Sequence, residues 1–235
     1  MAFSISRVTS ALTAGLLLAV VARIAVTRAQ AETATMVPPP GIDNPLAAGP
    51  VQTAVISGGC FWGVQGVFEH VKGVKRAVSG YAGGERSTAE YETVSTGSTG
   101  HAESVQITYD PSQISYGKLL QIAFSVAFDP TELNRQGPDS GTQYRSEFFY
   151  ADDAQKNIAT AYIAQLNGAQ VFKRPIATRV DPLQGFFPAE GYHQDYLTLH
   201  PTQPYIAMND LPKVDNLKRL FPDLYLQQPT LVNAH

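Results

Sequence analysis

Hydrophobic positions along the chain follow two spacings in turn, which predict strands and helices. The apolar, partly β-branched segment 51–57 (VQTAVIS) is typical of a strand. After it, apolar residues recur at helical spacing at Phe61, Val64, Phe68 and Val71. Gly73 ends that run. A strand, two glycines and a helix therefore follow one another, and Cys60 stands where the helix begins.

The later segments continue in the same way. Strands are predicted at 74–84, 102–109, 144–151 and 175–182, and helices at 116–128 and 152–167. Ser115 is a suitable N-cap for the first of these two helices, and acidic residues open the second. The order β α β β α β α β predicts an α+β fold, a two-layer sandwich whose mixed or antiparallel sheet is covered by helices, with a ferredoxin-like core.

The N-terminal residues differ from the rest. A basic start, an apolar block at 11–22 and the small residues 29–31 have the layout of a secretory signal peptide over 1–31, with an uncleaved membrane anchor as the alternative. We expect a proline-rich linker or arm at 32–50, a folded domain at 51–211 and a C-terminal tail at 212–235. A signal peptide places the protein outside the cytosol, in the periplasm.

Composition narrows the class of protein. Apolar residues make up 44% and charged residues 16% of the chain, as in globular proteins. A net charge of -3 without a long run of lysine or arginine argues against nucleic acid as a partner. The single cysteine excludes an internal disulfide and a multi-cysteine zinc site, and no cluster has the spacing of metal ligands.

Cys60, the only cysteine, stands two residues from Trp62, the only tryptophan, in the stretch GGCFWG. A helix N-terminus favours a thiolate, and the glycines before it allow a ligand to approach the backbone. The alternative is a cysteine that packs as a small hydrophobe. Phe61 and Trp62 beside it suggest an aromatic wall that suits an apolar group such as an S-methyl, or else simple packing.

Glu103 shares one face of its predicted strand with Val105 and Ile107. If that face is the core side, desolvation favours the neutral acid, which can donate a proton near neutral pH; the alternative is a solvated strand end.

Four other residues carry polar groups that suit a site. Tyr91 and Tyr144 flank loops and can donate hydrogen bonds or simply pack. Asp139 stands in a turn sequence. His193 is a candidate base for Cys60 or a structural histidine.

Four motifs occur in order along the chain: GGCFWG, STGSTGHAES, RQGPDSGTQYRS and PAEGYHQDY. Together they resemble the peptide methionine-S-sulfoxide reductases, the A-type enzymes, over residues 51 to about 211. The resemblance implies a repair enzyme that reduces methionine-S-sulfoxide, in proteins and as the free amino acid, to methionine.

The resemblance also implies roles for the residues of these motifs. Cys60 corresponds to the nucleophile that attacks the sulfoxide sulfur and becomes a sulfenic acid. Phe61 and Trp62 correspond to the pocket for the substrate methyl group, and Glu103 to the acid that protonates the sulfoxide oxygen.

Further polar residues match the same family. Tyr91 and Tyr144 correspond to hydroxyls that hold the sulfoxide oxygen, and Asp139 to an acidic residue near it. His193 lies in a matching motif and is expected among the substrate-binding residues.

Family members often carry further cysteines toward the C-terminus, and this chain has none. We therefore expect no bound cofactor and an external thiol as reductant, either a thioredoxin- or glutaredoxin-type protein or a small thiol. Oxidised proteins or peptides are the expected partners, and the enzyme is expected to be a monomer. Two alternatives are a cysteine hydrolase or acyltransferase that uses Cys60 and His193, and a binding domain without catalysis.

Overall fold

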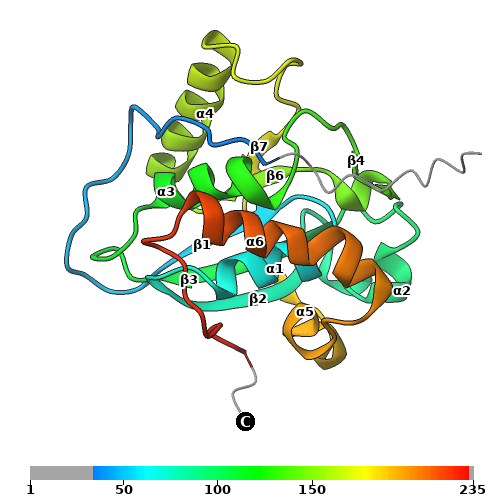
Figure 1. Cartoon of the computed structure of the whole chain (residues 1–235). Helices are drawn as coiled ribbons and strands as arrows, with labels where there is room; N and C mark the ends of the chain where they lie inside the picture. The colour runs from blue at the N-terminus through cyan, green and yellow to red at the C-terminus, as the bar shows by residue number, and fades with distance from the viewer. Residues whose placement is uncertain (1–33, 233–235) are drawn as a thin grey trace, which may run out of the picture.

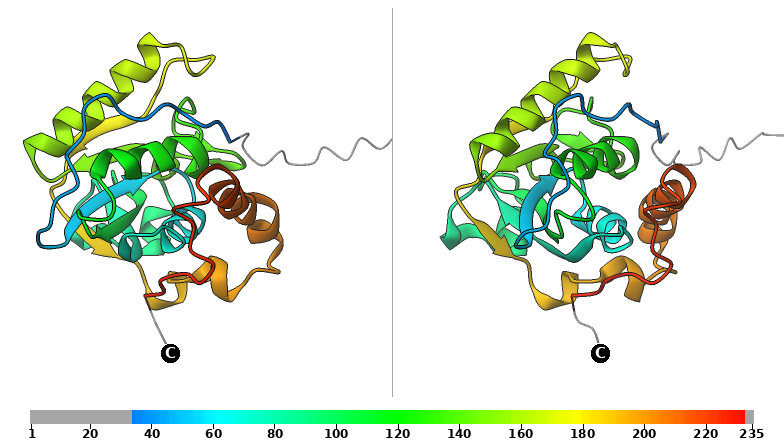
Figure 2. Two further views of the ribbon diagram at one scale, coloured as in Figure 1. Left: turned by 60° about the vertical axis from the view of Figure 1, so that its left-hand side comes forward. Right: turned by 90° about the vertical axis from the view of Figure 1, so that its left-hand side faces the viewer.

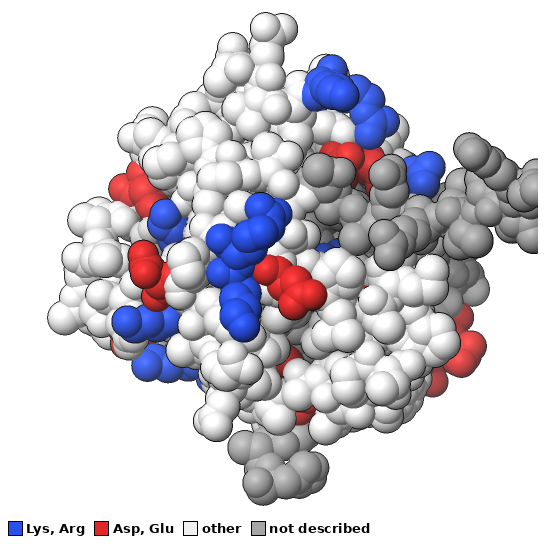
Figure 3. All heavy atoms as spheres, viewed as in Figure 1, with Lys and Arg blue, Asp and Glu red and all other residues white. Residues whose placement is uncertain are grey.

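The computed structural model describes residues 34–232. The predicted signal peptide at 1–31 lies outside these residues. Within the described part of the chain, no helix combines the length and the apolar character needed to cross a membrane. On the face in Figure 3, basic and acidic side chains are interspersed between broad uncharged areas, without a field of one sign.

A mixed six-stranded sheet forms the centre of the molecule, in the order β7-β6-β1-β3-β2-β8 (Figure 1). The strands are β1 (Gln52–Ser57), β2 (Val74–Ala82), β3 (Ala102–Tyr109), β6 (Glu147–Tyr150), β7 (Arg179–Pro182) and β8 (Phe186–Pro188). β6 and β7 are parallel, whereas the other neighbouring pairs are antiparallel. The predicted α+β class with a mixed sheet is thus confirmed.

Helices pack against this sheet, as Figures 1 and 2 show. The longer ones are α1 (Phe61–Glu69), α3 (Tyr116–Ile122), α4 (Asp153–Gly168) and α6 (Leu211–Leu220). Two short helices are α2 (Tyr91–Val94) and α5 (Tyr196–Leu199). The predicted caps are present, since Ser115 Oγ accepts from the Lys118 N–H and Asp152 Oδ1 from the Gln155 N–H.

Irregular turns complete the fold. A separate two-stranded hairpin is formed by β4 (Arg135–Gln136) and β5 (Asp139–Ser140). Three 3₁₀ turns are η1 (Arg86–Thr88), η3 (Thr142–Tyr144) and η4 (Gly191–His193), and two π-helical turns are η2 (Ala123–Ala127) and η5 (Ile206–Asp210).

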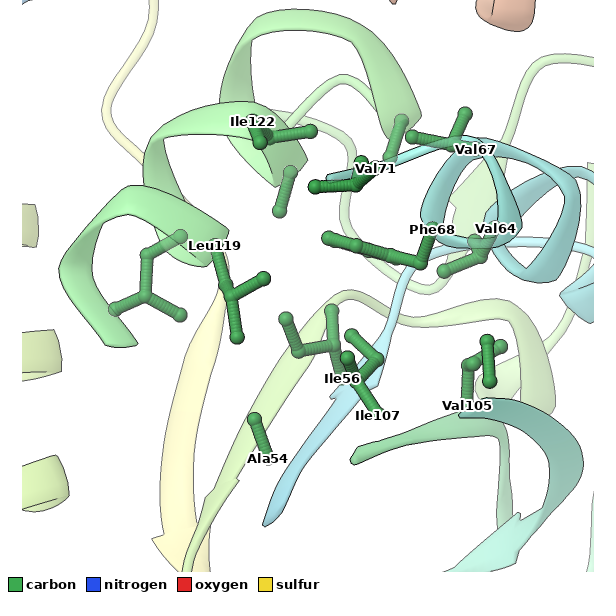
Figure 4. Packing of buried hydrophobic residues seen from close by; sticks show 14 of the residues in the cluster. Ala54, Ile56, Val64, Val67, Phe68, Val71, Val105, Ile107, Leu119 and Ile122 are labelled. Atoms are coloured by element: carbon green, nitrogen blue, oxygen red, sulfur yellow. The ribbon is translucent and has the colours of Figure 1, made fainter. Parts of the chain in front are cut away.

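The main core lies between the sheet and the helices α1 and α3 (Figure 4). Ile56 of β1 and Ile107 of β3 are completely buried and face Phe68 and Leu119 from the helices. The inward face predicted for β3 is confirmed, because Val105 and Ile107 are 0% exposed and Glu103 shares their side at 3%. Burial of these side chains supplies the main driving force for the fold.

The segments at either end of the described chain are packed against this body. In 34–50, Val37 is fully buried, and the Pro38 carbonyl accepts from the Tyr162 hydroxyl at 2.6 Å. At the other end, α6 places Leu217 in the core. β8 and α5 escaped sequence prediction because segments of three or four residues are too short to show a period.

Candidate active site

Cys60 is the N-cap of α1 and lies directly after the junction that follows β1. The space beside the glycines at this junction is filled by other side chains of the protein. A Cβ on Gly58 would collide with the ring of Phe128, and Gly59 has a φ of +84° with the Gln136 side chain against it. The prediction that these glycines admit a ligand is therefore corrected: they bring β1 and α1 close to Phe128 and Gln136, and Cys60 remains partly exposed.

The surroundings of Cys60 favour the thiol. Desolvation raises its pKa well above the usual value, and the carboxyl groups of Glu103 and Asp210 raise it further. The Trp62 N–H at the helix start lowers the pKa, as expected, but does not outweigh these effects. The helix start therefore favours the thiolate as expected, while burial and the two carboxyl groups favour the thiol in the free enzyme. The thiol becomes nucleophilic only when another group accepts its proton.

Glu103 approaches the same helix start from β3. Its Oε2 accepts a hydrogen bond of 3.0 Å from the Phe61 N–H, the residue directly after Cys60. Burial raises the pKa of Glu103 to about 8. The Phe61 N–H opposes this rise, and the carboxyl of Asp139 adds to it. Glu103 is thus a neutral acid near pH 7, held beside the thiol. Of the two alternatives that the strand pattern left open, the structure shows the buried one.

Tyr91 at the start of α2 and Tyr144 at the end of η3 lie around Glu103. Burial raises the pKa of both phenols, and the Glu103 charge raises both further. Both hydroxyls therefore remain protonated and able to donate. Asp139 of β5 accepts a short hydrogen bond from the Tyr205 hydroxyl, and burial raises its pKa although this bond lowers it. The structure thus brings the predicted polar residues together.

Aromatic side chains form the opposite wall. Phe61 is 1% exposed, and its ring centroid lies 5.0 Å from that of His193. Trp62 is partly exposed and stacks on Tyr196 with centroids 3.9 Å apart, and Tyr205 meets its edge at 6.2 Å. An aromatic wall of this kind offers apolar, polarisable contacts to a thioether or S-methyl group.

His193 belongs to this wall, beside Phe61 and Trp62. Its Nδ1 accepts a hydrogen bond of 3.1 Å from the Trp62 indole, so the proton of the neutral ring is on Nε2, which lies 4.0 Å from Glu190. Burial lowers the pKa of His193, which keeps it neutral. The Trp62 indole thus occupies Nδ1, whereas Nε2 is buried without a hydrogen-bond partner among the described residues.

Sequence reasoning missed the residues that hold this wall in place, although they stand in the quoted motif PAEGYHQDY. Glu190 accepts from the Tyr81 hydroxyl at 2.8 Å and from the Tyr91 N–H at 2.9 Å. Gln194 is 6% exposed. Its side-chain amide accepts from the Ser79 N–H and donates to the Ser79 carbonyl, so it pairs with the backbone of β2 as a neighbouring strand would. Only their tertiary partners reveal these roles.

Tyr205 and Asp210 were also missed, since no pattern in the sequence links them to Cys60. Across the part of the chain that the structure describes, no group of three or more His, Cys, Asp or Glu side chains is arranged to hold a metal ion. The site consists of a thiol, a neutral acid, phenols and an aromatic wall.

Known proteins of one family are similar to this chain in sequence. Residues 52–224 match the family described as peptide methionine sulfoxide reductase. Peptide methionine sulfoxide reductase MsrA 2 of Mesorhizobium japonicum is 64% identical over 181 residues, which cover 77% of this chain and 93% of the relative. The corresponding protein of Synechocystis sp. is 49% identical over 80% of this chain and 89% of its own.

Solved structures show the same relationship. Mxr1 from Saccharomyces cerevisiae in reduced form matches with a TM-score of 0.60 at 29% identity, over 74% of this chain and 98% of that one. Methionine sulfoxide reductase A of Corynebacterium diphtheriae matches with a TM-score of 0.57 at 31% identity, over 73% of this chain and 90% of that one.

A thiol beside a neutral acid and phenol donors suits an oxidoreductase that acts through its cysteine. The chain belongs to the peptide methionine sulfoxide reductase family and is an enzyme of the MsrA type.

Proposed function

We propose that Cys60 reduces methionine-S-sulfoxide by direct attack and becomes a sulfenic acid in each turnover. The observation that carries this proposal is the hydrogen bond from the Phe61 N–H to Glu103, which holds a neutral acid next to the thiol. A sulfoxide oxygen leaves sulfur readily only when it is protonated, and a buried carboxylic acid can supply that proton.

The site divides this reaction among its groups. The substrate methyl group packs on Phe61 and Trp62, and the sulfoxide oxygen accepts from Tyr91 and Tyr144. Glu103 protonates the oxygen, and the Cys60 sulfur attacks the sulfoxide sulfur. The attack forms an S–S bond between Cys60 and the substrate. The protonated oxygen then moves from the substrate sulfur to the Cys60 sulfur, so the substrate S–O bond and the S–S bond both break and methionine leaves, while the thiol proton restores Glu103. Thiol and sulfoxide thereby become sulfenic acid and methionine.

An external thiol completes the cycle in this proposal. Because Cys60 is the only cysteine in the chain, no second thiol of the same chain can form a disulfide with it. One external thiol displaces water from the sulfenic acid and forms a mixed disulfide. A second thiol releases Cys60, so two thiols become one disulfide for each sulfoxide reduced. A thioredoxin- or glutaredoxin-type protein or a small thiol supplies these electrons.

A single-turnover experiment tests the intermediate. The enzyme is mixed with a methionine-S-sulfoxide peptide and dimedone without reductant. We expect about one methionine released per enzyme, and a dimedone adduct on Cys60 by mass spectrometry. The Cys60→Ser variant is expected to give neither product. Turnover by that variant, or methionine release without an adduct on Cys60, would contradict the proposal.

Further proposals concern substrate range, location and topology. We propose that free and peptide-bound sulfoxides are both reduced and that the enzyme acts as a monomer. On the basis of the leader-like pattern at 1–31, we also propose that it acts in the periplasm. The order β6-β1-β3-β2 with antiparallel pairs supports the ferredoxin-like interpretation of the core. Fractionation of cells that express the full chain tests the location, and a cytosolic enzyme would exclude it.

A further inference from the structure

Asp210 is a buried carboxylate at the end of η5, outside the motifs that define the site. It is 0% exposed, and the Lys213 Nζ lies 3.3 Å from its Oδ1. Lys213 is itself only 8% exposed, so both partners of this ion pair are withdrawn from water. A buried ion pair costs desolvation energy and is weak evidence for stability alone, so another role has to be considered for it.

The pair lies directly against the first turn of α1. A Cβ added to Gly63 would collide with Asp210 Oδ1 and would lie 3.2 Å from Lys213 Nζ. Gly63 is the third residue of the helix that begins after Cys60. The absence of a side chain at this position therefore allows the ion pair to pack against the helix turn that carries the thiol.

The segment that ends in Asp210 begins with a pocket residue. Tyr205 directly precedes η5, donates its hydroxyl hydrogen to Asp139 and places its ring at the edge of Trp62. Its five following residues form a π-helical turn, a rare element that often occurs at functional sites. Asp210 is the last residue of this turn, so a single short segment joins Tyr205 to the ion pair.

We propose that the Asp210–Lys213 ion pair is a positioning device that docks η5 on Gly63 and thereby holds Tyr205 against Asp139 and Trp62, which sets the shape of the pocket beside Cys60. This inference rests on the proposed function of that pocket in binding the methyl group. Asp210 is a positioning residue because it acts through Tyr205 and Gly63.

Charge supports the same assignment. The groups that act electrostatically on Cys60 come from three elements: Glu103 of β3, Asp139 of β5 and Asp210 of η5, with Tyr91, Tyr144 and Tyr205 also responding to the Cys60 charge. Asp210 therefore raises the pKa of the thiol while Lys213 offsets the Asp210 charge. Loss of the Asp210 charge therefore makes the Cys60 thiol easier to ionise.

Asp210→Asn tests the device, with Asp215→Asn as the matched control. Asp215 lies in α6, the helix that follows Asp210, and is exposed, so the two variants lose the same charge in different places. Trp62 is the only tryptophan, so its emission reports directly on the pocket. Three readouts are KM and kcat for a sulfoxide peptide with dithiothreitol, the Trp62 emission, and the pH dependence of Cys60 alkylation.

We expect Asp210→Asn to raise KM about tenfold with a smaller change in kcat, since small displacements in a binding site cost up to ~10²-fold. The Trp62 emission changes, and the midpoint of alkylation moves to lower pH. Asp215→Asn behaves as the wild type. If Asp210→Asn turns over with wild-type KM and emission, the positioning role is overturned.

A second variant decides the matter if Asp210→Asn does not fold, as judged by circular dichroism. Gly63→Ala keeps both charges but pushes the pair away from α1, and a raised KM with altered Trp62 emission supports the proposal. A folded Gly63→Ala with wild-type KM and emission overturns it. Failure of the wild type and Asp215→Asn to reduce the sulfoxide would instead overturn the proposed function.

Discussion

The backbone N–H of Phe61 donates a hydrogen bond of 3.0 Å to Oε2 of Glu103, and so joins the start of α1 to β3 across 42 residues of sequence. This bond fixes the acid beside the thiol-bearing residue. It also lowers the Glu103 pKa, so that burial raises it to about 8 and no further. An acid with that pKa is still protonated at pH 7 but ionises readily once a substrate accepts its proton.

Replacement of Glu103 by Gln tests this acid. The general acid is active when protonated, so we expect kcat/KM of the wild type to fall as pH rises through about 8. Glu103→Gln should lower the rate by about 10²–10³-fold and abolish this alkaline limb. The measurement is the pH–rate profile with dithiothreitol at saturating concentration. An unchanged limb in the variant would assign the ionisation to another group.

His193→Ala distinguishes an aromatic wall residue from a base. The Trp62 indole loses its acceptor at Nδ1, and the pocket loosens. We expect KM to rise, with kcat/KM lower by roughly tenfold, which corresponds to about 1.4 kcal/mol. The pH dependence of Cys60 alkylation should stay the same. A large shift of that dependence would show that His193 acts on the thiol after all.

Gly58→Ala tests the packing at the junction before Cys60. The new Cβ collides with the Phe128 ring, so we expect unfolding to become easier by about 1–3 kcal/mol. Gly168→Ala at the end of α4 is the control, because nothing lies within 4 Å of its Cβ. Urea unfolding measures both. A Gly58→Ala protein as stable as the control would mean that Phe128 yields without cost.

Glu69 gives a pH-dependent stability. Burial raises its pKa to about 9, and the charge of Asp195 raises it further. The folded protein holds the Glu69 proton more tightly than the unfolded chain does. The contribution of Glu69 to the free energy of unfolding is therefore complete below pH 4.5 and is lost as pH rises through about 9.

Glu69→Gln should remove this dependence. Between about pH 5 and pH 8, the free energy of unfolding of the wild type should fall with rising pH. In Glu69→Gln this slope should be smaller by about 1 kcal/mol per pH unit. The exposed carboxylate of Glu92 provides the control, Glu92→Gln, which should keep the wild-type slope. Equal slopes in all three proteins would show that Glu69 is not protonated in the fold.

Local pattern was sufficient for the regular parts of this protein. The alternation in β3 and the helical spacing after Phe61 reflect burial on one face, which a period records directly. The same period placed Glu103 on the face of Val105 and Ile107 but left open whether that face is buried, and the structure shows that it is. Short elements such as β8 were missed because three residues carry no period.

The sequence by itself determined the order of the longer strands and helices, and a single thiol two residues from the only tryptophan. Only the tertiary structure decided what surrounds that thiol. Glu103, Asp139 and Asp210 approach it from different elements, and desolvation by the assembled core outweighs the helix start. Desolvation and charge act through space, so no local pattern records them until the chain is folded.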